Sequence, residues 1–352
     1  MLLSIRPSLF AILLPLLLSR HLPTAASRPA PPSDTWRSSD RFMDAERGTH
    51  VAGLSDLKRY FSRFGYLPEP DPDANPTDAF DDRLETAVSL YQTRLGLRVT
   101  GKLDAATLAE ITTPRCGVPD NATLAPSRAH SVGRFAFFPG EPRWARSGPI
   151  VLTYAVSPTA TIHYLPRGTV EAVFDLAFAR WAQAIPVQFT KTANYESADV
   201  KIGFYSGDHG DGEPFDGVLG VLAHAFSPES GRLHLDAAET WAVDFRRERS
   251  AVAVDLESVA THEIGHVLGL AHSAVKNSVM YPSLSPRTKK ADLRADDVEG
   301  VQALYGSNPD FSFSSLIESD TTDSGSAAAR RGGGVRSSCM GFLLVLVLVI
   351  VI

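Results

Sequence analysis

The sequence predicts an α+β protein in which a small helical domain precedes a larger mixed domain. Residues 50–112 show helical periodicity only, in three short segments, whereas residues 150–306 mix strand-like and helix-like segments. In that second part, strands alternate with helices too rarely for a doubly wound parallel sheet. One of its helices also carries a regular histidine pattern, so the larger domain is the place to look for chemistry.

Length and composition fit a globular protein with room for two domains. The chain has 352 residues, of which 44% are hydrophobic and 21% are charged. The net charge is −6 and there is no long basic run, so nothing points to a nucleic-acid partner.

The N-terminus has the pattern of a secretory signal peptide. Arg6 supplies a positive charge, residues 8–18 are largely apolar, and Thr24-Ala25-Ala26 offers small residues before a cut at Ser27. The apolar run is too short to span a membrane. We therefore expect residues 1–26 to be removed during export.

The C-terminus has the layout of a signal for a glycosylphosphatidylinositol (GPI) anchor. Residues 341–352 are uniformly apolar but short of the roughly 20 residues of a membrane-spanning helix. They follow small residues at 324–328 and a polar spacer. We expect attachment at Ser326, removal of residues 327–352, a linker at 307–326, and anchoring in the outer leaflet of the plasma membrane. A short tail anchor is the alternative.

The first domain is expected to be a bundle of three short helices. Apolar residues recur at helical spacing in residues 54–67, 80–95 and 105–111, and Asp104 precedes the third segment as an N-cap. About 70 residues suffice for one modest core. The pattern resembles peptidoglycan-binding modules, so a wall-binding domain is the alternative reading.

The second domain contains alternating strand and helix signals. Strands are expected at residues 150–156, 187–190 and 199–205, and helices at 169–183, 258–269 and 296–305.

The second of these helical regions, residues 258–269, carries the start of the pattern H-E-x-x-H-x-x-G-x-x-H, which spans residues 262–272. His262 and His266 are four residues apart, which places both imidazoles on one face of a helix. Gly269 ends the helix and lets the chain return with His272. Three neutral imidazoles hold zinc with one position open for water, and Glu263 is placed to act as the general base. The alternative is a surface helix whose histidines make ordinary hydrogen bonds and bind no metal.

A second cluster has the composition of a closed tetrahedral site. Three imidazoles and one carboxylate are suited to a structural zinc that keeps no open position. Its members are His209, Asp211, His224 and His234.

Cys116 is the one cysteine that remains if the C-terminal signal is removed with Cys339. It lies in the run Pro-Arg-Cys-Gly-Val-Pro-Asp at residues 114–120. A thiolate is a strong zinc ligand, and Cys116 in the open zinc position would leave no place for water. Arg115 and Asp120 have opposite charges, but as an isolated pair they are expected to contribute little.

Taken together, these motifs resemble the matrixins, the matrix metalloproteinases, over residues 50–306. The run at 114–120 is similar to their cysteine switch, and Val279-Met280-Tyr281-Pro282 is similar to the Met-turn of metzincins. The resemblance implies a zincin fold, with a twisted mixed sheet and three helices, behind a three-helix propeptide domain. A compact chain with a GPI-type tail looks most like the plant members.

The resemblance also implies metal and peptide sites. It assigns the four residues of the second cluster to structural zinc, Met280 to the floor beneath the zinc histidines, and residues 220–226 to an edge strand that pairs with an extended peptide. Residues 279–285 would wall the pocket for the residue after the cut, with Ser258 influencing its depth. Calcium would bind the carboxylates of Asp216, Asp236 and Glu239 and the carbonyls of Gly217, Leu219 and Val221. A further calcium site is doubtful because Arg232 stands where relatives have an acid.

By the same resemblance, activation would cut between Arg134 and Phe135, and the new ammonium would pair with Asp296. Residues 27–134 would then be the propeptide and residues 135–306 the catalytic domain. Asn121 begins an Asn-Ala-Thr acceptor sequence for N-glycosylation.

The function expected from this reading is that of a monomeric, secreted, cell-surface zinc endopeptidase made as a latent zymogen. It would hydrolyse extended segments of extracellular-matrix or cell-wall proteins. A catalytically inactive surface protein that binds peptides or the cell wall is the alternative. The presence of Glu263 and the three histidines argues against this alternative.

Overall fold

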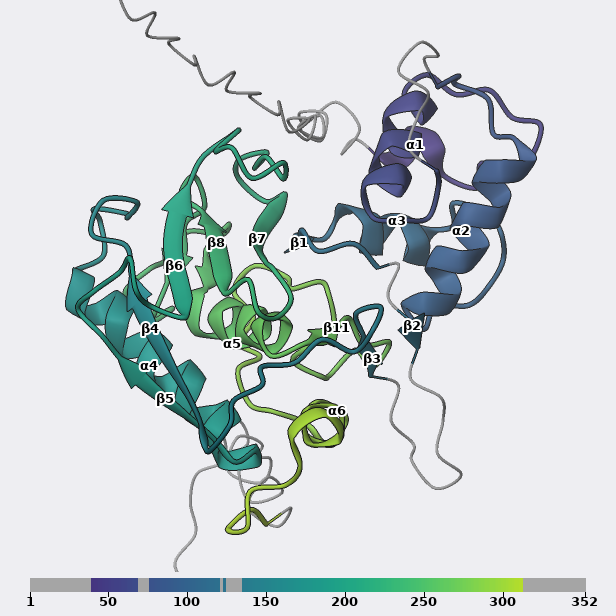
Figure 1. The fold of residues 1–352 in the computed structure, drawn as a ribbon. Helices are drawn as coiled ribbons and strands as arrows, with labels where there is room; N and C mark the ends of the chain where they lie inside the picture. The colour runs from purple at the N-terminus through teal and green to yellow at the C-terminus, as the bar shows by residue number, and fades with distance from the viewer. Residues whose placement is uncertain (1–38, 69–75, 121–122, 125–134, 313–352) are drawn as a thin grey trace, which may run out of the picture. The chain divides into compact units, whose positions relative to one another are not determined.

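A computed structural model of the chain describes residues 39–68, 76–120, 123–124 and 135–312 (Figure 1). The residues up to Phe311 belong to one compact unit. The predicted signal peptide, the Asn121 acceptor, Arg134, Ser326 and the apolar C-terminal tail all lie outside the described residues. Within the described part, no helix is both long and apolar enough to cross a membrane.

The first domain is the expected bundle of three helices. After a short 3-10 turn at Ser39–Phe42 come α1 (Leu54–Arg63), α2 (Asp82–Arg94) and α3 (Ala105–Thr112). The Asp104 carboxylate accepts a hydrogen bond from the Thr107 amide, which confirms the predicted N-cap. Helix α1 ends four residues earlier than expected, because Gly65 takes a left-handed conformation just after it.

Aromatic rings form the core of this bundle. Tyr60, Phe61, Phe64, Tyr66 and Tyr91 are buried and meet mostly edge to face, with ring centroids 4.7–6.3 Å apart. The bundle core extends to Phe215, Val221 and Tyr281 of the second domain. The two domains therefore share apolar contacts.

The second domain is built on a mixed sheet with the strand order β1-β7-β8-β6-β4-β5. Strand β4 is parallel to both β5 and β6, β6 is parallel to β8, and β7 is antiparallel to β8. The edge strand β1 comes from the segment after α3 and runs parallel to β7. The strands are β1 (Arg115–Cys116), β4 (Ile150–Val156), β5 (Val187–Lys191), β6 (Val200–Tyr205), β7 (Val221–Ala225) and β8 (Arg232–Asp236).

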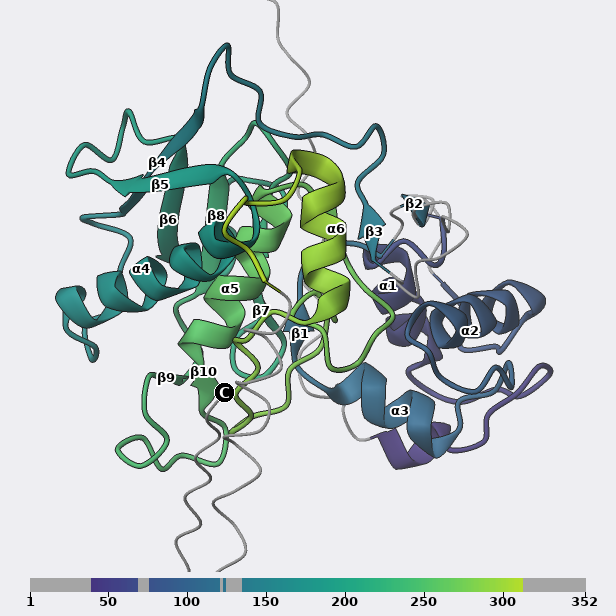
Figure 2. The ribbon, with the colours of Figure 1, turned by 90° about the horizontal axis from the view of Figure 1, so that it is seen from below.

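Helices α4 (Arg167–Ala184) and α5 (Leu256–Val267) pack against each other and lie on the same side of this sheet (Figures 1 and 2). The indole of Trp181 on α4 is fully buried and donates a hydrogen bond of 2.9 Å to the Thr261 carbonyl of α5. Helix α6 (Ala295–Tyr305) contacts α4. The predicted α+β class, with a mixed sheet and three helices behind a three-helix domain, is confirmed.

Two small sheets complete the second domain. One pairs β9 (Trp241–Ala242) with β10 (Val254–Asp255), and the other orders β11 (Leu270–Ala271), β3 (Ala136–Phe137) and β2 (Thr123–Leu124). The short strands, and β8 (sequence RLHLD), are not among the strands expected from the sequence.

Residues at both ends of α5 explain where this helix begins and ends. The Asp255 carboxylate caps it by accepting from the Ser258 amide at 2.8 Å. Beyond its last residue, Gly269 has a φ of 104°, a conformation that side chains disfavour. The chain turns there and returns along β11, which brings His272 back beside the helix.

Gly265 provides a test of how tightly α5 is packed. A Cβ at this position would lie 2.2 Å from the Met280 sulfur and 3.0 Å from Trp181. We expect Gly265→Ala to lower the free energy of unfolding by about 1–3 kcal/mol, measured by urea denaturation, because Met280 and its neighbours must move.

Gly168→Ala is the matched control, since Gly168 lies in the first turn of α4 with open space around it. That exchange should raise stability by up to about 1 kcal/mol. Equal effects of the two exchanges would contradict the tight packing at Gly265.

Candidate metal centre

Three imidazoles converge at the end of α5. His262 and His266 project from successive turns of the helix, and His272 follows β11. The Nε2 atom of His266 lies 3.1 Å from that of His262 and 3.2 Å from that of His272. The three ring nitrogens therefore face one point.

The opposite ring nitrogens each have an acceptor that fixes the ring. The Nδ1 atom of His262 lies 2.7 Å from the Val279 carbonyl, and that of His266 lies 2.8 Å from the Leu270 carbonyl. The Nδ1 atom of His272 lies 2.6 Å from the Asp120 carboxylate. A proton on each Nδ1 leaves the Nε2 lone pair free to bind a metal.

The strand β1 brings Cys116 to the same point. Its amide donates to the Pro282 carbonyl at 2.9 Å, and the Gly117 amide donates to the Ala223 carbonyl of β7 at 2.8 Å. The segment is thus held between β7 and the chain after Met280. The Cys116 sulfur lies 3.4 Å from Nε2 of His266, and the thiol and three imidazoles all lie within 4.8 Å of one another.

Gly117 is required because β1 lies very close to β7. The space between β7 and the chain at Pro282–Leu284, which β1 fills, is here called the cleft. A Cβ at position 117 would lie 2.6 Å from a methyl group of Val221 on β7. Only glycine lets β1 approach the edge strand this closely.

The Arg115–Asp120 pair is far more consequential than its sequence suggests. Both side chains are only 3% exposed, and the guanidinium makes two hydrogen bonds of 2.8 Å to the carboxylate. Asp120 also accepts from the Tyr66 hydroxyl at 2.7 Å. The pair is therefore not the isolated one that the expectation assumed, and leaving either buried charge without its partner would cost about 3–5 kcal/mol.

Glu263 lies beside the histidines as a buried carboxylate. It is fully buried, and neither of its oxygens has a hydrogen-bond partner among the described residues. Burial raises the pKa of this carboxyl to about 8. Burial also raises the pKa of the Cys116 thiol and lowers those of His262 and His266 well below their usual range.

These features together fit a bound zinc. Neutral imidazoles, a buried thiol and a nearby carboxylate form a donor set suited to a divalent cation. The acceptors on the opposite ring nitrogens match the way metal-binding histidines are oriented.

The second predicted cluster is also assembled. The Asp211 carboxylate lies 2.9 Å from His209 and 2.8 Å from both His224 and His234. Burial opposes ionisation of Asp211, but hydrogen bonds from the three histidines outweigh it and hold the pKa of the carboxyl well below its usual range. Four ligands of types suited to zinc thus meet, which is the number that a closed tetrahedral site requires.

The predicted calcium residues gather around one loop but do not form so tight a group. The carboxylates of Asp216, Asp236 and Glu239 accept hydrogen bonds of 2.7–3.0 Å from the amides of Val221, Gly217 and Leu219 respectively. Burial, with the neighbouring acids, raises the pKa of Glu239 to about 8 and that of Asp236 to about 6. One oxygen of Glu239 is buried without a partner among the described residues. The acids are therefore placed to take a cation.

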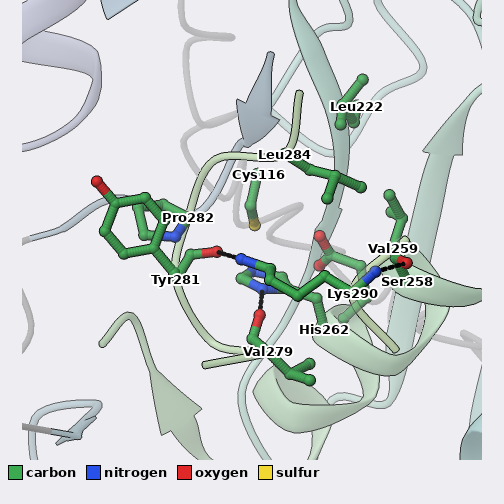
Figure 3. A pocket seen from close by; sticks show the side chains of 11 residues that line it. Cys116, Leu222, Ser258, Val259, His262, Val279, Tyr281, Pro282, Leu284 and Lys290 are labelled. Carbon is green, nitrogen blue, oxygen red and sulfur yellow. Dashed lines mark hydrogen bonds between the residues drawn. The ribbon is translucent and has the colours of Figure 1, made fainter. Parts of the chain in front are cut away.

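A narrow pocket opens beside His262 and Glu263 (Figure 3). Leu222, Val259, Leu284 and Tyr281 supply most of its apolar wall. Ser258 lines it as expected, but its hydroxyl accepts from the Lys290 amide at 2.6 Å.

Two contributors to the site are not signalled by any sequence motif in their own segments. Lys290 extends along the pocket toward the Tyr281 carbonyl (Figure 3). Asp297 accepts hydrogen bonds of 2.9 Å from the amides of Val279 and Met280. Asp297 thereby holds the turn whose buried Met280 packs against Gly265, between the two helical histidines.

Comparisons with known proteins agree with this geometry. Residues 143–306 match the family model described as matrixin, and residues 51–111 match a putative peptidoglycan binding domain. The chain is 51% identical over 318 residues to metalloendoproteinase 1-MMP of Arabidopsis thaliana, covering 90% of this chain and 85% of that protein.

The chain belongs to the matrixin family. It is also 54% identical over 269 residues to metalloendoproteinase 4-MMP of Arabidopsis thaliana, covering 76% of this chain and 77% of the relative. Identity to human neutrophil collagenase is 38% over 265 residues, or 72% of this chain and 50% of the human protein. This matrixin is a metalloendopeptidase of a zinc-dependent family, and its two histidine-rich groups are suited to metal.

Metal analysis tests the two histidine-rich groups. We expect two equivalents of zinc in the purified chain, one for each group. His224→Gln should lose one equivalent, because three remaining donors hold zinc much less tightly than four.

His163→Gln is the control, since His163 is exposed and belongs to neither group. It should retain both equivalents. A wild-type content of one equivalent, unchanged by His224→Gln, would exclude zinc from the second cluster.

Proposed function

We propose that this matrixin is a secreted, cell-surface endopeptidase made as a latent zymogen, with Glu263 as its general base. The observation that carries the proposal is the position of Cys116. Its sulfur lies against His266 within a group of three imidazoles. The Glu263 carboxylate lies beside them and has no hydrogen-bond partner among the described residues. A thiol at this place excludes water from the site that the histidines form.

Extended protein segments are the proposed substrates. The segment around Cys116 already pairs with β7 on one side and with the chain at Pro282–Leu284 on the other. Once that segment has left, the same backbone amides and carbonyls are available to a peptide, the β-augmentation mode of recognition. Extracellular-matrix or cell-wall proteins with accessible extended stretches fit this cleft.

His262, His266 and His272 would hold the catalytic zinc. When bound, zinc polarises the peptide carbonyl and lowers the pKa of a water molecule. Glu263, one residue after the first ligand, accepts the proton of the attacking water and returns it to the leaving amine. The apolar pocket beside His262 holds a side chain of the substrate and so fixes the peptide bond in register.

Cleavage between Arg134 and Phe135 is the proposed activation step. Phe135 lies against Gly300 on α6, where a Cβ would be 3.1 Å from the Phe135 Cβ. Asp296, one turn earlier on this helix, receives a hydrogen bond of 2.6 Å from Ser273. A new ammonium at Phe135 would be near this carboxylate, which supports the proposed pairing.

The remaining parts of the proposal concern export, anchoring and calcium. The signal-peptide pattern at residues 1–26 and the tail pattern after Ser326 support export followed by GPI anchoring at the plasma membrane. Asn121 would be glycosylated in that route. Calcium at Asp216, Asp236 and Glu239 would brace the loop before β7, and the mature enzyme would act as a monomer.

A wall-binding role for the first domain is the second candidate, favoured by its match to a peptidoglycan-binding model. Against it stands the way the segment after α3 fills the cleft with Arg115 and Cys116 buried. A propeptide would be lost on maturation, whereas a wall-binding module would be kept.

Peptide hydrolysis before and after treatment with a thiol-reactive mercurial tests the proposal. Activity should appear only after treatment, and o-phenanthroline should abolish it. Cys116→Ser should be active without treatment, because a hydroxyl is a far weaker zinc ligand than a thiolate. Glu263→Ala should lower kcat about 10²–10⁴-fold with zinc retained.

No hydrolysis of a broad peptide library, with zinc bound and the first domain removed, would sink the endopeptidase proposal in favour of a binding protein. Sequencing of the active form would separately overturn the proposed cut if its N-terminus lay well away from Phe135.

A further inference from the structure

A second cavity, here called the basic pocket, shares part of its wall with the pocket beside His262. Its volume is about 370 Å³, and it shares Tyr281, Leu284 and Lys290 with the pocket beside His262. Four cationic side chains line it, whereas Glu110 is the one carboxylate among its lining residues. The cations are Lys276, Lys289, Lys290 and Arg294.

Lys290 stands between the two pockets. Its ammonium is 3.5 Å from the Tyr281 carbonyl and 3.4 Å from the Ser283 carbonyl, both long for hydrogen bonds (Figure 3). Burial lowers its pKa to about 8, which the carboxylates of Asp297 and Glu110 oppose. The ammonium is thus partly desolvated, and its bonds to protein acceptors are weak.

The other cations leave the pocket with a positive excess. Lys289 is neutralised by Glu257, whose carboxylate lies 2.6 Å from its ammonium. Lys276 lies exposed on the rim. The single acid, Glu110, is carried by α3, so it departs with the propeptide and the excess of positive charge rises.

Glu110 places a carboxylate among the residues that line the basic pocket. It lies on the first domain yet faces residues of the second, and one of its carboxylate oxygens is buried without a hydrogen-bond partner among the described residues. Burial raises the pKa of the Tyr281 hydroxyl, and the Glu110 carboxylate raises it further. The latent chain therefore keeps an acidic side chain against this wall while its cleft is filled.

We propose that the basic pocket binds an acidic side chain of the substrate, carried by the segment that follows the cut bond, and that Glu110 takes its place in the latent chain. The inference rests on the proposed endopeptidase function. The segment 279–285 lines both pockets, and the pocket beside His262 would take the residue after the cut. Glutamate or aspartate a few residues further along would reach it.

Electrostatics sets the size of the effect. A carboxylate near a partly exposed cluster of lysines gains a modest energy, so we expect about a fivefold preference for glutamate over glutamine at low ionic strength. Salt should weaken the preference, because screening acts on partly exposed charges.

The test uses the chain after mercurial activation and loss of the propeptide, checked by N-terminal sequencing, with a series of peptides that have one cleavable bond. Leucine follows the cut, and glutamate, glutamine or lysine occupies the second, third or fourth position after it. At one position kcat/KM should fall in the order glutamate, glutamine, lysine.

Removal of charge identifies the pocket. Lys276→Gln with Lys290→Gln should bring the glutamate-to-glutamine ratio close to one, and the surface exchange Lys276→Gln alone should lower it in part. Lys191→Gln is the matched control, because it removes the same charge from β5 at the other edge of the sheet and should leave the ratio unchanged.

Two outcomes are distinguishable from failure of the proposed function itself. If the peptides are cut but glutamate is not preferred at any position, the basic pocket does not select acids. If glutamate is preferred and the ratio survives the double exchange, some other site provides the selectivity. Absence of any cleavage would instead count against the endopeptidase proposal.

Discussion

The contact between the Cys116 sulfur and the three imidazoles depends on a short buried segment being held on both sides. Backbone pairing with β7 and with the chain at Pro282–Leu284 fixes its direction, and Gly117 allows the approach. The site it reaches has neutral imidazoles, and burial there raises the pKa of the Glu263 carboxyl and of the Cys116 thiol itself. Such a set is costly to bury without a cation, so the physical demand for a metal arises from the protein's own residues.

The carboxylate of Asp120 ties this segment to the metal site and to the first domain at once. It accepts two hydrogen bonds from Arg115 and one from the Tyr66 hydroxyl of the helical bundle. It also lies 2.6 Å from Nδ1 of His272. Arg115 in turn lies over the Phe64 ring at 3.7 Å. The aromatic core of the bundle therefore supports the position of the thiol, and the bundle has a structural purpose that does not require it to bind a wall.

Much of the fold and most of the candidate site could be predicted from sequence, because the signals are local. The spacing of His262 and His266, the glycine after α5 and the Asp104 cap each act within a few residues. What escaped prediction is set by contacts between distant segments. Asp120 and His272 are 152 residues apart, and Lys290 and Asp297 reach the site from the chain beyond residue 285. Arg115 is buried where its strand pairs with β7 and its guanidinium lies over Phe64. No periodicity or spacing carries such information.

The measurement that bears most directly on the central claim is zinc X-ray absorption of the purified full-length chain, carried out on His224→Gln so that zinc at His262, His266 and His272 dominates the signal. One sulfur at about 2.3 Å and three imidazole nitrogens at about 2.0–2.1 Å are predicted. After activation, the sulfur should be replaced by a light atom while the nitrogens remain. A shell of nitrogen and oxygen alone in the latent chain would contradict the account, because Cys116 would then not be a zinc ligand.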